Sequence, residues 1–153
     1  MPRPTAQGRS EVYAAHLAQG RDLNERNDCA VRAVAAATGR SYDEVHALFK
    51  AEGRGDARRT PVSITWAVLK QLGFRTERRH ERDFIAQYPG SHARVLKSVT
   101  THHPDRFPGA WKNGKTYLMF TPGHILAIVD GVNHDWTRGR ALRATCIYEV
   151  LPA

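Results

Sequence analysis

The chain has 153 residues, which suits a single domain, and its 41% hydrophobic and 25% charged residues exclude wholesale disorder. Its net charge of +8 attracts acidic partners over long range but carries no information about the fold. Two cysteines exclude a disulfide scaffold and a four-cysteine zinc site, and the longest aliphatic run, residues 125–129, is far too short to cross a bilayer.

The first residues, 1–9, predict a flexible arm, because they combine two prolines, a glycine and two arginines with little apolar surface. No apolar stretch follows this arm, so we expect no secretory signal and a cytoplasmic protein in a reducing environment. Residues 10–153 then predict one domain, with a helical half over about 10–73 and a β half over about 116–153.

Two helices are predicted before residue 40. Residues 10–19 place apolar side chains at helical spacing. Residues 28–38 are rich in alanine and almost wholly apolar, which predicts a buried helix. Asn27 or Asp28 can cap its first amides with a side-chain oxygen, and Gly39 supplies the stop.

Two further helices are predicted from their start signals. Ser41, followed three positions later by a glutamate, is the capping-box pattern and opens a helix through about residue 51. Thr60 and Pro61 predict a cap and a first helical residue, and Gly73 ends that helix.

Short apolar runs separated by turn residues dominate the second half. Asp130 and Gly131 are a strong signal for a two-residue hairpin. We therefore predict helices first and then an antiparallel meander, which is an α+β fold. The expected strands cover residues 74–78, 117–120, 124–129, 132–136 and 144–151, with a helical turn at 83–88 and a long polar segment at 91–115.

Cys29 is the candidate nucleophile, because it lies at the start of the predicted buried helix. A helix N-terminus favours negative charge, so it stabilises a thiolate and lowers the pKa of the thiol. The free amides of the first turn can also receive an oxyanion. The alternative is that Cys29 is a small apolar filler of the core, as a lone buried cysteine often is.

The hairpin predicted around residues 130–131 brings a base and an acid together. In this register His124 faces Thr137, and Asp135 is its diagonal neighbour on the same face. Diagonal neighbours are within reach of an imidazole and a carboxylate, so we predict His124 as the general base and Asp135 as the group that orients it. The alternatives are a solvated histidine at a strand edge and a surface carboxylate.

Three stretches together resemble a compact papain-like cysteine peptidase, namely residues 27–33, 123–131 and 135–136. Within that superfamily the chain resembles small phage- and bacterium-encoded members. Its Cys-His-Asp order is similar to that of bacteriocin-leader-processing peptidases. The segment around Cys29 is also similar to ovarian-tumour-type deubiquitinases.

The resemblance implies a papain-like domain in which the cysteine, histidine and aspartate have the roles given above. It implies a protein or peptide substrate, no metal and no cofactor, and an origin in a phage or a virion. The chain departs from the family at the oxyanion donor, because Leu23 stands where papain-like enzymes place a glutamine. Asn24 and Asn27 are the nearby amide side chains, and Asn27 can equally be only a helix cap.

The remaining signals favour ordinary structural interpretations. The histidine pair in residues 102–105 predicts a polar loop rather than a metal site, because no further ligand motif accompanies it. Cys146 lies in a predicted strand, where no helix N-terminus activates it. Basic residues cluster at 75–82 and 138–143, a pattern typical of nucleic-acid contacts or of a solvated surface.

The sequence therefore predicts a cysteine hydrolase, peptidase or isopeptidase-like, that cleaves an amide or acyl bond through Cys29, His124 and Asp135. Its substrate is a protein or peptide, and the basic surface suits an acidic one. The alternative is a non-enzymatic basic module of the same fold that binds nucleic acid, a virion or a partner protein. Fast thiol labelling near pH 6–7 distinguishes the enzyme from the binding module.

Overall fold

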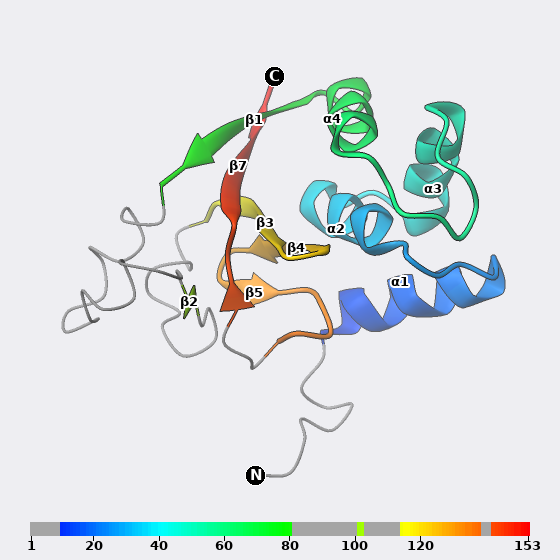
Figure 1. Cartoon of the computed structure of the whole chain (residues 1–153), viewed down its shortest axis with the longest axis horizontal. Coiled ribbons are helices and arrows are strands. Elements are labelled where there is room, and N and C mark those ends of the chain that lie inside the picture. Colours follow the sequence, from blue (N-terminus) through cyan, green and yellow to red (C-terminus); the bar gives the residue numbers. More distant parts are fainter. Residues whose placement is uncertain (1–9, 81–100, 103–113, 139–141) are drawn as a thin grey trace, which may run out of the picture.

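The structure, a computed structural model, describes residues 10–80, 101–102, 114–138 and 142–153. Within these residues the fold is α+β, as predicted, with four N-terminal helices followed by a five-stranded antiparallel sheet. Figure 1 shows the helices gathered on one side of the sheet. The helices are α1 (Glu11–Asp22), α2 (Cys29–Thr38), α3 (Tyr42–Ala51) and α4 (Val62–Gln71).

The strand order of the sheet is β1-β7-β3-β4-β5, so the predicted simple meander is wrong at its last strand. β7 does not lie beside β5 but pairs with both β1 and β3. Its side chains suit a strand in the interior of the sheet, since Ile147 packs on one face of the sheet and Val150 on the other. The strands are β1 (Phe74–Arg79), β3 (Thr116–Thr121), β4 (His124–Val129), β5 (Val132–Asn133) and β7 (Cys146–Pro152), and a separate pair joins β2 (Thr101–His102) to β6 (Leu142–Arg143).

Helix α2 is the centre of the core. Its side chains are mostly buried, including Val31 and Val34, and it packs against β4 and β3 on one side and the other helices on the other. Side chains alternate along each strand, so Leu118 and Ala127 face α2 while Met119 joins a second apolar cluster. The prediction of a buried helix over 28–38 is confirmed.

The start of α3 agrees with the sequence signal, whereas the start of α4 differs from it. Ser41 caps α3, and its hydroxyl accepts a hydrogen bond from the Glu44 amide at 3.2 Å. At α4, however, Pro61 is the cap residue rather than the first helical residue. Thr60 does not cap that helix, because its hydroxyl accepts from the Arg54 Nε at 3.0 Å.

Several predictions concern residues outside those that the structure describes. They are the arm at 1–9, the turn at 83–88, most of the polar segment at 91–115, the loop residues 103–105, and parts of the basic clusters at 75–82 and 138–143. Among the described helices, none has the length and apolar character needed to cross a membrane.

Candidate active site

Cys29 is the first residue of α2, and it lines a pocket at that end of the helix. Asp28 occupies the cap position but, contrary to the prediction, its side chain does not cap. Its carboxylate accepts instead from the Tyr42 hydroxyl at 2.7 Å and from the Arg32 guanidinium. The first-turn amides of α2 therefore have no side-chain cap, and the helix N-terminus remains available to a negative charge.

The β4–β5 hairpin begins in the predicted register, but the predicted strand over 132–136 is too long, because β5 ends at Asn133 and Asp135 lies in the turn that follows. Val129 pairs with Val132, which leaves Asp130 and Gly131 as a two-residue turn. Both turn residues have positive φ, 45° and 82°, as a type I′ turn requires. The turn thus determines which residues of the returning chain lie near the start of β4.

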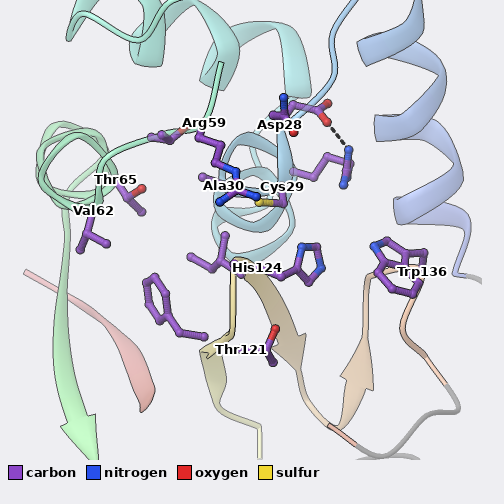
Figure 2. Close-up of a pocket in the computed structure, with 15 residues that line it drawn as sticks. Asp28, Cys29, Ala30, Arg59, Val62, Thr65, Thr121, His124 and Trp136 are labelled. Carbon is purple, nitrogen blue, oxygen red and sulfur yellow. Dashed lines mark hydrogen bonds and ion pairs between the residues drawn. The ribbon is translucent and has the colours of Figure 1, made fainter. Parts of the chain in front are cut away.

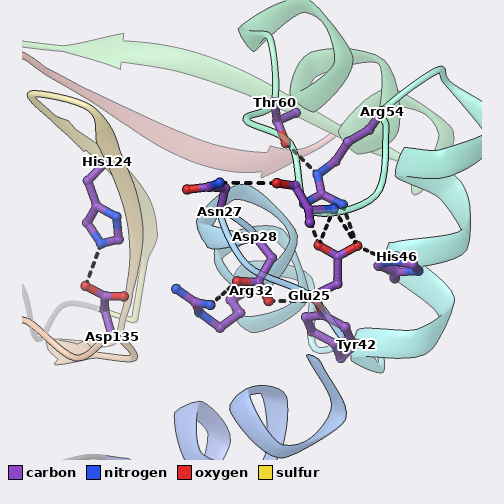
Figure 3. Close-up of polar contacts among 11 residues, drawn as sticks. Glu25, Asn27, Asp28, Arg32, Tyr42, His46, Arg54, Thr60, His124 and Asp135 are labelled. Atoms are coloured by element: carbon purple, nitrogen blue, oxygen red, sulfur yellow. Dashed lines mark hydrogen bonds and ion pairs between the residues drawn. The ribbon is translucent and has the colours of Figure 1, made fainter. Parts of the chain in front are cut away.

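His124 contacts Asp135 (Figure 3) and lies beside Cys29 at the pocket (Figure 2). Its Nε2 donates to the Asp135 Oδ2 at 2.8 Å. Because this bond occupies Nε2, the ring nitrogen left for the sulfur of Cys29 is Nδ1. The structure brings the three predicted residues into one series of side-chain contacts.

The electrostatics of this group favour separated charges. Burial alone would raise the pKa of Cys29, but hydrogen bonds with the His124 side chain and the Ile125 backbone, with the charges of His124 and Arg32, lower it. Burial would lower the pKa of His124, but hydrogen bonds with Asp135 and Cys29 raise it to about 9. Both shifts stabilise a thiolate beside an imidazolium.

Further hydrogen bonds fix the position of the Asp135 carboxylate. It is buried, and its Oδ2 also accepts from the Thr137 hydroxyl at 2.8 Å and the Thr137 amide at 3.3 Å. The Asn133 side chain in turn donates to the Thr137 hydroxyl at 3.1 Å. The Trp136 ring lies beside the His124 ring, with 5.6 Å between the ring centroids (Figure 2). These contacts restrict the rotation of the His124 ring and of the Asp135 carboxylate.

A buried polar cluster holds the loop that precedes Cys29 (Figure 3). The Glu25 carboxylate accepts two hydrogen bonds from Arg54, at 2.8 and 3.2 Å, two contacts of 3.2 Å from the Ala57 amide, and one of 3.0 Å with His46. Burial would raise the pKa of Glu25, but these donors lower it to about 2. We call Glu25, His46, Arg54 and Ala57 the loop clamp.

The pocket beside Cys29 and His124 has a volume of about 440 Å³. Its walls are the start of α2, the segment that leads into α4 and the β3–β4 turn. Two of its apolar residues, Val62 and Trp136, are 46% and 39% exposed. Figure 2 shows them on opposite sides of Cys29, so apolar surface flanks the sulfur in two directions.

The structure brings Asn27 to the pocket but not Asn24. Both residues have positive φ, 57° and 55°, a conformation that asparagine adopts more readily than most residues. The Asn27 side chain donates to the Ala57 carbonyl at 3.2 Å, whereas Asn24 is exposed in the turn after α1. Of the two predicted oxyanion donors, only Asn27 lines the pocket.

One group of side chains in the described residues has the spacing of metal ligands. The ligand atoms of Glu25, His46 and Asp56 lie within 4.8 Å of one another. Arg54 already contacts both oxygens of Glu25, and its guanidinium would repel a cation there. We therefore assign no metal to this group.

The other sequence signals lie apart from the pocket. Cys146 begins β7 and does not line the pocket. In the first basic cluster, Arg75 pairs with Glu77, and Arg79 pairs with both Glu77 and Glu149. Part of this cluster is therefore neutralised within the molecule.

Sequence reasoning missed the loop clamp, the Asp28–Tyr42 bond and the pocket residue Arg59. These contacts join loops that no local pattern relates to one another. Comparisons with protein-family models, with curated proteins and with solved structures found no match. The case for a function therefore rests on the geometry of this site.

Proposed function

We propose that this protein is a cysteine hydrolase, papain-like in arrangement, that cleaves an amide or related acyl bond in a protein or peptide. The observation that carries the proposal is the position of His124, which donates to Asp135 through Nε2 and lines one pocket with Cys29, whose pKa it lowers. A cysteine, a base and a group that orients the base are the parts of an activated nucleophile. The free thiol also suits the reducing cytoplasm expected from the sequence.

In acylation, the Cys29 thiolate bonds to the carbonyl carbon, and the electron pair of the C=O bond moves to oxygen. The His124 imidazolium then gives its Nδ1 proton to the leaving nitrogen as the C–N bond breaks. The products of this step are a thioester on Cys29, a neutral imidazole and a free amine. Asp135 keeps the ring in the orientation that presents Nδ1 to the sulfur.

In deacylation, the neutral His124 takes a proton from water, and the water oxygen bonds to the thioester carbon. The C–S bond breaks, and a carboxylic acid leaves. The thiolate and the imidazolium are restored, so the cycle needs no cofactor.

The start of α2 supplies donors for the oxyanion. The amides of Cys29 and Ala30 belong to the first turn and have no side-chain cap. Asn27 has a second N–H on the nitrogen that already donates to Ala57. Removing one such donor typically slows acyl transfer by about 100- to 1000-fold, so Asn27→Ala tests its contribution.

Intact-mass labelling with limiting iodoacetamide at pH 6 tests the proposal without a known substrate. A thiol of pKa about 8.5 is only about 0.3% thiolate at that pH and reacts slowly. We expect one fast label in the wild type that Cys29→Ala removes, with Cys146→Ala as the matched control that keeps it. Slow labelling of the wild type at pH 6, or a fast label on Cys146, would contradict the proposal.

The non-enzymatic alternative draws its support from the net charge of +8. It predicts ordinary Cys29 reactivity together with binding to DNA or RNA that weakens steeply as salt rises. The same protein sample, titrated with a fluorescent oligonucleotide at two salt concentrations, measures this.

A further inference from the structure

Besides Cys29 and His124, whose opposite charges balance, the charged side chains that line the pocket are Asp28, Arg32 and Arg59. Asp28 and Arg32 form an ion pair, so their charges balance. Arg59 has no hydrogen bond or ion pair with any residue that the structure describes. The pocket therefore has one positive charge that nothing in the described structure compensates.

The Arg59 guanidinium lies close to the reacting groups. Arg59 is exposed in the loop before α4, and Figure 2 shows its side chain extending toward Cys29 and Ala30. A Cβ added to Gly123 would lie 3.9 Å from the Arg59 Nη2 and 4.0 Å from its Nη1. Gly123 immediately precedes His124, so the guanidinium reaches the β3–β4 turn that carries the base.

The surroundings of Arg59 suit a chain that carries an acidic group. Val62 and Trp136 give exposed apolar surface on the two sides of Cys29, along which an extended acyl substrate can lie. A guanidinium offers a fork of N–H donors that matches the two oxygens of a carboxylate. Within the described residues Arg59 has no ion pair that the binding of a carboxylate would have to break.

We propose that the substrate of this hydrolase carries a carboxylate next to the scissile bond, and that Arg59 binds it. This inference rests on the function proposed above and names its substrate class. The carboxylate can belong to an acidic side chain or to a chain terminus, and both present the same group to the guanidinium.

The test compares two small electrophiles that differ in charge. Iodoacetate and iodoacetamide both alkylate a thiolate, with loss of iodide, but only iodoacetate carries a carboxylate. The ratio of their rate constants at Cys29 is measured by intact mass in the Cys146→Ala background. We expect Arg59→Ala to lower the iodoacetate-to-iodoacetamide ratio about two- to fivefold, as for other partly exposed charge pairs, and Arg59→Glu to lower it further.

Arg58→Ala is the matched control, because Arg58 is an exposed neighbour that does not line the pocket. It should leave the ratio unchanged. An unchanged ratio in both Arg59 variants, or an equal fall in Arg58→Ala, overturns the inference while fast iodoacetamide labelling still supports the hydrolase. Slow iodoacetamide labelling of every protein overturns the hydrolase itself.

A second set of probes separates the two sources of the carboxylate. Chloroacetyl-glutamine amide is neutral, chloroacetyl-glutamate amide has an acidic side chain, and chloroacetyl-glutamine with a free carboxyl end has an acidic terminus. Faster labelling of Cys29 by one acidic probe than by the neutral one, lost in Arg59→Ala, supports the inference and identifies the source. Equal labelling by all three probes overturns it.

Discussion

Two buried acid–base groups lie on opposite sides of the start of α2, and they differ in one respect (Figure 3). In the loop clamp, the Glu25 carboxylate accepts hydrogen bonds from Arg54, Ala57 and His46, and no member of this group lines the pocket. In the other group, Asp135 holds one nitrogen of His124, and the second nitrogen is left for Cys29. We call the first group closed, because protein donors occupy both oxygens of its carboxylate, and its role is to fix a loop. The second group is open, because one nitrogen of His124 remains for Cys29, and it can therefore transfer a proton.

The pKa shifts of the two groups express the same difference. The pKa of Glu25 is lowered to about 2, so its charge stays constant across ordinary pH values. The pKa of His124 is raised to about 9, which keeps an imidazolium next to a thiol whose own pKa is lowered. The first shift stabilises a fixed ion pair, and the second stabilises a reactive one. Four variants test this contrast.

Arg54→Ala should have the largest effect, because it opens the closed group. Its side chain is only 1% exposed, and its loss leaves Glu25 as a buried carboxylate without its guanidinium partner. Breaking such a pair costs about 3–5 kcal/mol, which urea denaturation would show as a lower free energy of unfolding. Arg58→Ala, on the exposed neighbour, should stay within about 0.5 kcal/mol. A loss below about 1 kcal/mol for Arg54→Ala would mean that the clamp does not hold the loop.

His124→Ala should have the next largest effect, and it should act on reactivity. Without the imidazolium the pKa of Cys29 rises, so we expect iodoacetamide labelling at pH 6 to fall about 100-fold. His46→Ala removes a histidine from the closed group and is the matched comparison for rate. Similar labelling rates in the two histidine variants would erase the distinction between the groups.

Asp135→Asn should lower the pKa of His124 from about 9 toward its ordinary value of 6.5, because the neutral amide no longer favours the charged ring. In the wild type the imidazolium persists until the pH approaches 9, whereas in the variant it is lost at lower pH. A titration of the ring followed by NMR measures this directly. Labelling at pH 7 should fall about tenfold, and Asp56→Asn, an exposed carboxylate near the clamp, should change neither quantity. An unaltered titration of His124 would show that Asp135 does not set its charge.

Thr137→Val should have the smallest effect. It removes one of several donors to Asp135 and nearly preserves the shape of the side chain. We expect a loss of about 1 kcal/mol in the free energy of unfolding and a modest fall in labelling at pH 6. The control is Thr145→Val, because the Thr145 hydroxyl hydrogen-bonds the Phe120 carbonyl at 3.1 Å rather than Asp135. If the two variants had the same labelling rate at pH 6, Thr137 would have no specific role in positioning Asp135.

The contact between His124 and Asp135 could be predicted because a local signal determines it. Asp130 and Gly131 adopt positive φ with little strain, so they select a two-residue turn and one register. That register brings the chain back along β4, but the pairing ends at Asn133, and the turn around Asp135 was predicted as strand. The helix that begins at Cys29 could also be predicted, since its alanine-rich composition and the glycine that ends it identify it.

The loop clamp could not be predicted, because Glu25 and Arg54 come from loops that look merely polar. The same holds for Asp28, whose local pattern indicates a cap while Tyr42, from another helix, takes its carboxylate. The position of β7 between β1 and β3 was also missed. Its alternating apolar residues are compatible with several neighbours, and only the packing of both faces selects among them.

The place of β7 in the sheet has a consequence for how a newly made chain assembles. β3, β4 and β5 are neighbours in sequence, so the hairpin that joins His124 to Asp135 can form as soon as the ribosome releases it. In the described sheet β1 has β7 as its partner, and that pairing joins Arg79 to Ile147 across a long intervening segment. Contacts so distant in sequence form slowly, because a large loop must close first. In a newly made chain, His124 and Asp135 can therefore come together before the sheet is complete. At that stage β1 has not yet paired with β7.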